Sequence, residues 1–269
     1  MPDYTQILYA QERRVVTITL NRPERLNAWT GVMEAEFIDA IKTASDDDGV
    51  GCIVVIGAGR AFCAGADIGG WAEGQAKQPE RERPPALVMT PYQRASPNVP
   101  ITLYEGKPVI AAINGPAVGI GLTMSLACDI RIASERARFS ARFVRVGLTP
   151  ECGGTHNLPE VAGIQTAMEL ALTGRIINAD DPLAAKLVSR IVPHDDLMPA
   201  AYALAHEIAS GPTYPVWLTK RLIRRNAAEQ HIQQVVATET QLFAQVRDKP
   251  DHLEATRAFV EKREPRFHG

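Results

Sequence analysis

Three glycine-rich turns and one acid are the parts of this sequence that could do chemistry. The turns are 57-GAGRAFCAGADI-68, 114-NGPAVGIGLTMSLACDI-130 and 147-GLTPECGGT-155, and each follows an expected strand. Glycine lets backbone N–H groups approach a ligand closely. Where a turn opens into a helix, its N–H groups are unpaired and lie at the positive end of the helix dipole. Two such turns side by side could bind one developing oxyanion with two amides.

Spacing alone favours a simpler interpretation, in which the glycines only allow tight strand–helix loops. The acid of the third turn is Glu151, which follows Pro150 and precedes Cys152 and two glycines. By residue type, it is either an exposed acid at a turn or helix cap, or a base held over a reacting carbon. Both interpretations remain open at this point.

The composition excludes several classes of protein. Hydrophobic residues make up 45% of the 269 residues and the formal net charge is −2, so we expect a sizeable core and no nucleic-acid partner. Four cysteines without C-x-x-C spacing are expected to be reduced thiols, not disulfides or a zinc site. The sequence shows neither a signal-peptide layout nor an apolar run of membrane-spanning length. We therefore expect a cytoplasmic protein without membrane contact.

The pattern of elements predicts an α/β fold. Alternating strands and helices are expected up to about residue 150, with Thr30 capping a helix over 31–47. Amphipathic helices follow; their expected ranges are 164–174, 197–210, 215–228 and 231–246. We divide the chain into a core of residues 1–200 and a helical region of residues 201–269, and we expect the apolar helix faces to contact other subunits. Residues 71–100 are expected to form a long surface loop.

Six stretches, in order and spacing, resemble the enoyl-CoA hydratase/isomerase (crotonase) family. They are 61-AFCAGADI-68, 108-PVIAAINGPAVGIG-121, 128-CDIRIAS-134, 147-GLTPECGGT-155, 171-ALTGRIINADDPLAAKLVSRIV-192 and 258-AFVEKREPRF-267. The resemblance runs from about residue 5 to residue 267. It implies a spiral core of ββα turns, a C-terminal helical trimerisation region, and a homotrimer or a dimer of trimers.

The resemblance also implies an acyl-CoA thioester substrate, with coenzyme A as part of the substrate and with no metal or other cofactor. It assigns the two oxyanion-hole amides to Ala64, before the glycine of AGAD, and to Ile120, where the family has glycine. Backbone contacts to the CoA portion are implied at Ala28 and along the stretch Gly65, Ala66, Asp67 and Ile68.

The reaction depends on which residue is the base. Hydratases of the family place two glutamates at positions that are Thr123 and Phe143 here, and neither side chain accepts a proton near neutral pH. Isomerases of the family carry an acid directly after the proline of G-L-x-P, where this sequence has Glu151. One carboxylate is sufficient for a 1,3-proton shift, and Phe143 and Val144 could keep it dry and raise its pKa.

We therefore expect an enoyl-CoA isomerase. The alternatives are a hydratase or C–C hydrolase that uses Glu151 and water, and a non-catalytic acyl-CoA-binding homologue. Other residues have simpler expected roles: Asp129 stabilises the fold, His156 is structural, and Cys63 is a buried filler. By default, we expect solvated side chains at Glu73, at Glu80 and in the cluster of Lys220, Arg221, Arg224 and Arg225. For the cluster, the alternative role is binding of the CoA phosphates.

Overall fold

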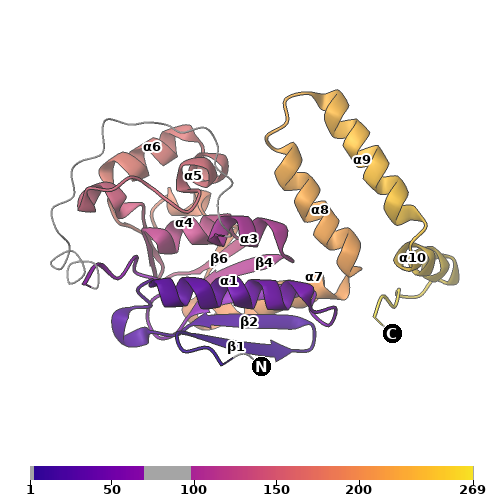
Figure 1. Cartoon of the computed structure of the whole chain (residues 1–269), viewed down its shortest axis with the longest axis horizontal. Coiled ribbons are helices and arrows are strands. Elements are labelled where there is room, and N and C mark those ends of the chain that lie inside the picture. The colour runs from indigo at the N-terminus through magenta and orange to yellow at the C-terminus, as the bar shows by residue number, and fades with distance from the viewer. Residues whose placement is uncertain (1–2, 70–97, 269) are drawn as a thin grey trace.

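The computed structural model describes residues 3–69 and 98–268 (Figure 1). Its main sheet has six strands in the order β1-β2-β3-β4-β6-β9, and only the first pair is antiparallel. The strands are β1 (Ile7–Glu12), β2 (Val15–Leu20), β3 (Cys52–Gly57), β4 (Val109–Ile113), β6 (Ile130–Ser134) and β9 (Arg190–Val192). The predicted α/β class is confirmed.

The central strands are buried on both faces, as their continuous apolar sequences predict. Along β3, Ile53 and Val55 enter one core cluster while Cys52 and Val54 enter the other. Helix α1 (Gly31–Asp46) covers the first face, and Thr30 caps it by accepting a hydrogen bond from the Met33 amide at 3.1 Å. Helix α7 (Leu197–Ser210) covers the second face with a stripe of small residues that includes Ala201, Ala205 and Ala209.

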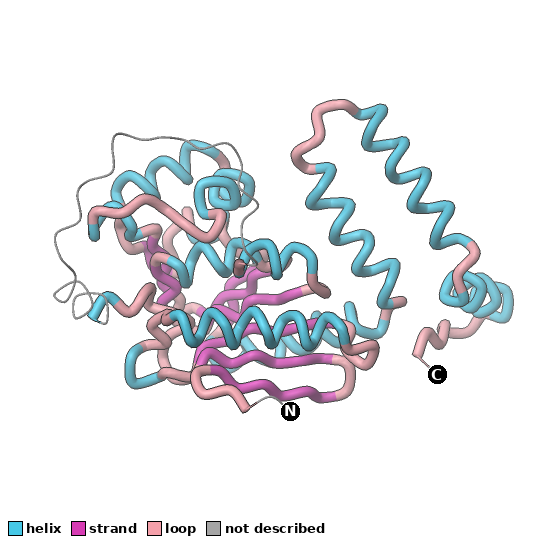
Figure 2. Tube along the Cα trace, viewed as in Figure 1, coloured by secondary structure: helices cyan, strands magenta, loops and turns pink. Residues whose placement is uncertain are grey.

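A small second sheet supports the turns that carry the candidate chemistry. It consists of β5 (Pro116–Val118), β7 (Arg138–Ser140) and β8 (Ile177–Asn178). Helices α3 (Val99–Glu105), α4 (Ile120–Ala127), α5 (Gly154–Ala162) and α6 (Ile164–Thr173) lie with it on the α1 side of the main sheet (Figure 2). Short 3-10 turns span Pro23–Arg25, Arg142–Val146, Ala184–Lys186 and His194–Asp196.

Three further helices, α8 (Thr213–Asn226), α9 (Ile232–Arg247) and α10 (Pro250–Glu261), leave the core, and α9 and α10 stand apart from the sheet (Figure 1). No residue of α9 is buried. Residue 200, where we expect the division, lies inside α7, and Ala201, Ala205 and Ala209 of this helix are buried on the sheet. In residues 3–69 and 98–268, no helix is both long and apolar enough to cross a bilayer.

Candidate active site

Two glycine backbones meet where the first and second glycine-rich turns pack together. Gly65 has φ +109° and Gly119 has φ +56°, conformations that side chains rarely adopt. A Cβ added to Gly119 would lie 3.7 Å from the Gly65 Cα. The first turn is held against β5 by a hydrogen bond of 2.9 Å from the Val118 amide to the Cys63 carbonyl. The two residues that follow these glycines in the chain are therefore brought close to each other.

Those following residues, Ala66 and Ile120, carry amides without an acceptor among the described residues. Ile120 is the first residue of α4, so its N–H has no partner within the helix. Two unpaired amides beside a cavity can bind one oxygen that becomes negative during a reaction.

The amide of Ala64 is arranged differently from our expectation. It donates to the carbonyl of Leu26 at 3.0 Å, so it is already paired. The side chain of Asn27 holds the same region by donating to the carbonyls of Ala58 and Ala61. The structure thus moves the first candidate donor from Ala64 to Ala66, because Ala64 serves to hold the turn.

Glu151 is positioned by a left-handed turn in front of α5. Cys152 has φ +54° and Gly153 has φ +69°, and a positive φ at a non-glycine residue is uncommon. The turn brings the side chain of Glu151 to two cavities, of about 220 and 330 Å³, which both also touch Ala66 and Ile120. The structure thus brings the acid and the two unpaired amides together.

The surroundings of Glu151 favour its protonated form. Glu151 is solvent-accessible, but its partial burial raises its pKa, and the negative charge of Glu34 raises it further. Phe143 lines the 220 Å³ cavity as expected, whereas Val144 is 39% exposed and does not. A carboxylate whose pKa is raised is a stronger base, which is suitable for taking a proton from carbon.

Glu34 is a site residue that the sequence did not reveal. It lies in the first turn of α1, where an acid is ordinary. In the structure it lines the 330 Å³ cavity with Glu151, and its side chain has no hydrogen-bond or ion-pair partner among the described residues. Only the packing of α1 beside the third turn brings these two acids together, so no sequence signal could have found the pair.

The residues assigned to the CoA side form a connected rim. Arg22 donates to the Ala28 carbonyl at 2.6 Å and pairs with Asp67 at 2.9 Å. Gly65 and Ile68 line the 220 Å³ cavity, and Ile68 is 49% exposed. Arg22, which we did not predict, thus links the two stretches implied to contact CoA.

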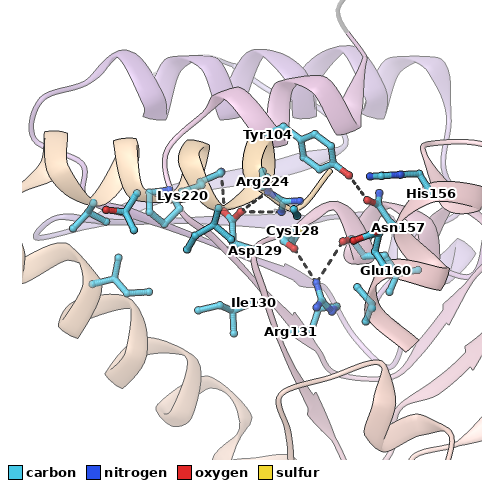
Figure 3. A pocket seen from close by; sticks show the side chains of 18 residues that line it. Tyr104, Cys128, Asp129, Ile130, Arg131, His156, Asn157, Glu160, Lys220 and Arg224 are labelled. Carbon is cyan, nitrogen blue, oxygen red and sulfur yellow. Dashed lines mark hydrogen bonds and ion pairs between the residues drawn. The ribbon is translucent and has the colours of Figure 1, made fainter. Parts of the chain in front are cut away.

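A third, larger cavity of about 560 Å³ holds a cluster of paired charges (Figure 3). Asp129 pairs with Lys220 at 2.8 Å and with two nitrogens of Arg224, at 2.8 and 3.0 Å. Lys220 also donates to the carbonyls of Leu103 and Lys107. These contacts attach α8 to the core, so Asp129 stabilises the fold as predicted.

Lys220 and Arg224 are not the solvated residues that we expected by default, because their charges are used within this cluster. Arg221 lies over the Trp217 ring at 4.9 Å.

His156 is exposed and lines this 560 Å³ cavity, not the cavities of Glu151. Cys63 is fully buried, and burial raises the pKa of its thiol to about 12. It is therefore an unreactive filler, as predicted. Glu73 and Glu80 lie outside the described residues. In the described part of the chain, no three His, Cys, Asp or Glu side chains are placed to hold a metal ion.

The chain is similar to several known proteins. A family profile described as enoyl-CoA hydratase/isomerase matches residues 10–269. The chain is 37% identical to the 1,2-epoxyphenylacetyl-CoA isomerase of Escherichia coli K12, over 98% of each chain. It is 36% identical to a probable mitochondrial enoyl-CoA hydratase of Dictyostelium discoideum, over 95% of this chain and 88% of that one. A crystal structure of a probable enoyl-CoA hydratase/isomerase from Mycobacterium abscessus superposes with a TM-score of 0.82, at 33% identity and 98% coverage of each chain.

Proposed function

Because the chain belongs to the enoyl-CoA hydratase/isomerase family, we propose that it is an isomerase that moves a double bond along the acyl chain of a CoA thioester. One observation carries the proposal: the acid Glu151 lines the same cavities as the unpaired amides of Ala66 and Ile120. The coenzyme A portion enters with the substrate along the rim of Arg22, Ala28 and Asp67. The reaction is proton transfer alone, and we invoke no metal or redox cofactor for it.

The proposed reaction has two proton transfers and one intermediate. Glu151 takes a proton from C2 or C4 of the acyl chain, and the electrons of that C–H bond move into the thioester carbonyl. The resulting enolate oxygen is stabilised by the amides of Ala66 and Ile120, each by about 3 kcal/mol on the scale of one lost donor. Glu151 then returns the proton to the other carbon, so that the enzyme is unchanged and the double bond has moved.

The choice of Ala66 over Ala64 follows from the hydrogen bonds. A donor that already satisfies the Leu26 carbonyl would have to break that bond before it could bind substrate. The Ala66 amide has no such competitor in the described residues. A preorganised free donor stabilises a developing charge without rearrangement during the reaction.

The direct test follows both possible products. The enzyme is incubated separately with 3-enoyl-CoA and 2-enoyl-CoA, and the double-bond shift and 3-hydroxyacyl-CoA are measured by liquid chromatography and mass spectrometry. We expect interconversion of the two enoyl esters. We further expect Glu151→Gln to lower this rate by about 10³-fold, with little change in CoA-ester affinity. Unchanged turnover in that variant would remove Glu151 as the base.

Hydration is the second candidate, and one observation favours it. A second carboxylate, Glu34, lines the cavity of Glu151, and two acids could hold a water molecule between them. Several relatives carry hydratase names, among them the short-chain-enoyl-CoA hydratase of Clostridium acetobutylicum. Accumulation of 3-hydroxyacyl-CoA without double-bond movement would select hydration. Binding without any turnover would instead indicate a non-catalytic acyl-CoA-binding homologue.

A self-assembled oligomer is part of the proposal. Large apolar side chains are exposed along the outer helices, including Ile232 at 65%, Leu253 at 58% and Phe259 at 84%. A single chain gains nothing from exposing such groups. We propose a homotrimer, or a dimer of trimers, in which α8, α9 and α10 contact neighbouring copies.

A further inference from the structure

We propose that Glu34 is a positioning residue of this site: its carboxylate, held on α1 across the cavity from Glu151, makes Glu151 a stronger base. This inference rests on the isomerase function proposed above. It adds a residue from a part of the chain that none of the catalytic turns contains. Glu34 itself exchanges no proton with the substrate.

The fold holds Glu34 firmly at its place. It lies between Met33 and Phe37, which are fully buried in the core below α1. The cap at Thr30, which also donates to the Gln6 side chain at 2.6 Å, fixes the start of the helix. Glu34 is therefore a half-buried acid on a rigid element, and the helix fixes the position of its backbone.

The cavity between the two acids contains no compensating charge among the described residues. Besides Glu34 and Glu151, its lining is Trp29, Thr30, Gly31, Ala66, Asn98, Val99, Pro100, Ile120 and Cys152. Burial raises the pKa of the Cys152 thiol to about 12, so that this neighbour is neutral near pH 7. Arg142 lines the other cavity of Glu151 and is not part of the lining of this one. Glu34 therefore acts on Glu151 without a neutralising partner.

The direction of the effect follows from electrostatics. A negative charge across a partly closed cavity disfavours the ionised form of a second carboxylate and favours the form that has captured a proton. The proton that leaves the acyl carbon is then held more firmly by Glu151 while the enolate charge rests on the amides. A negative charge in this cavity cannot stabilise the enolate oxygen, so Glu34 acts through the base alone.

The test separates the effect of side-chain charge from that of side-chain shape at position 34. Glu34→Gln keeps the shape and removes the charge, whereas Glu34→Asp keeps the charge and shortens the side chain. The measured quantity is the pH dependence of kcat/KM for enoyl-CoA isomerisation, which rises as Glu151 loses its proton. We expect Gln to move this rise to lower pH by roughly 0.5–1 unit and to lower the plateau about two- to threefold. Asp should leave the position of the rise near that of the wild type.

A matched control removes one charge from the same helix far from the cavity. Asp46 is exposed at the end of α1, about 18 Å along the helix from Glu34 at 1.5 Å per residue. Asp46→Asn should leave the profile unchanged. A rise that does not move in Glu34→Gln, or that moves equally in Glu34→Asp, overturns the inference.

A second readout needs no turnover. The ¹³C signal of the Glu151 carboxyl is titrated in protein labelled at glutamate Cδ and is identified by its loss in Glu151→Gln. Its midpoint should fall in Glu34→Gln, and an unchanged midpoint contradicts the inference. The proposed function and the role of Glu34 can be disproved separately. Full activity in Glu151→Gln removes the proposed function. An inactive Glu151→Gln, together with an unchanged pH profile in Glu34→Gln, removes only the role of Glu34.

Discussion

Gly154 packs directly against Thr123, and this contact joins the loop of Glu151 to helix α4. A Cβ added to Gly154 would lie 2.5 Å from the Thr123 Cγ2 and 3.4 Å from the Pro150 Cβ. Thr123 is buried, and it stands in the same helix whose first amide belongs to Ile120. The acid and one of the two donors are thus held by a single packing contact.

Gly154→Ala should therefore separate the acid from the donors. The added methyl forces the turn of Glu151 away from α4, and a displacement of about 1 Å at a reacting group can cost about 10²-fold in rate. We expect kcat for isomerisation to fall by that order while the protein stays folded. Wild-type kcat in this variant, with an unchanged melting temperature, would show that the contact does not position Glu151.

Gly119→Ala should lower kcat through the donor that follows it. Alanine is strained at φ +56°, and relief of the strain turns the Ile120 amide away from its position. We expect kcat to fall about 10²-fold with a smaller change in KM. The control is Gly163→Ala, which imposes similar strain at φ +80° between α5 and α6, with nothing near the new methyl. Equal losses in both variants would contradict a specific role for the Ile120 amide.

Glu151→Gln should stabilise the fold at neutral pH. Burial raises the pKa of Glu151 above its unfolded value, so the folded state favours the protonated acid. That stabilisation is present below the unfolded pKa and is lost as the pH rises through the folded pKa. We expect the melting temperature of the variant to exceed that of the wild type at pH 7, on the order of 1 °C, and the difference to vanish near pH 4. A larger difference at pH 4 than at pH 7 would reverse the sign of this expectation.

Asp129→Asn should destabilise the attachment of α8. The variant leaves Lys220 and Arg224 without their carboxylate in a cluster where the Lys220 side chain is 6% exposed. Breaking a buried ion pair typically costs about 3–5 kcal/mol, measured here by urea unfolding. Glu169→Gln, which breaks an exposed pair with Arg175, should leave the unfolding midpoint nearly unchanged. Similar midpoints for the two variants would mean that the buried cluster contributes little.

The outer helices should control assembly. Val236→Asp combined with Phe259→Asp places charges among side chains that are 52% and 84% exposed in the single chain. We expect the wild type to have a mass of three or six chains by light scattering and the double variant to dissociate. Gln233→Asp adds a charge to α9 at an exposed polar position and should leave the mass unchanged. A monomeric wild type would disprove the assembly.

The strands and helices that face the core were predictable because burial leaves a pattern in sequence. β3 and β4 are continuous apolar runs between turns, and α1 has both its cap and its apolar stripe. Helix α10 lies within the expected helical region of residues 201–269, but its range is not predicted, because only Ala258 of its residues is buried and a helix without a core face has no clear stripe. Helix α5 is not predicted because it begins at Gly154, directly after the left-handed residues Cys152 and Gly153, and contains Pro159.

The site was partly predictable. Its three turns and Glu151 could be identified from sequence, but which amide of the first turn is free depends on the hydrogen bond from Ala64 to Leu26. That bond joins segments almost forty residues apart, and local pattern cannot reveal it. Glu34 was hidden for the same reason, since its neighbour across the cavity is more than a hundred residues away in the chain.

The proposed donors, Ala66 and Ile120, contribute main-chain atoms, and two glycines set their positions. The side chains that surround the acyl group are consequently free to vary without removing charge stabilisation, as an isoleucine at position 120 illustrates. A protein engineer could therefore resize this pocket for a bulkier or branched acyl group by changing side chains at Ile120, Phe143 or Leu148, while the catalytic framework of backbone and acid is left as it stands.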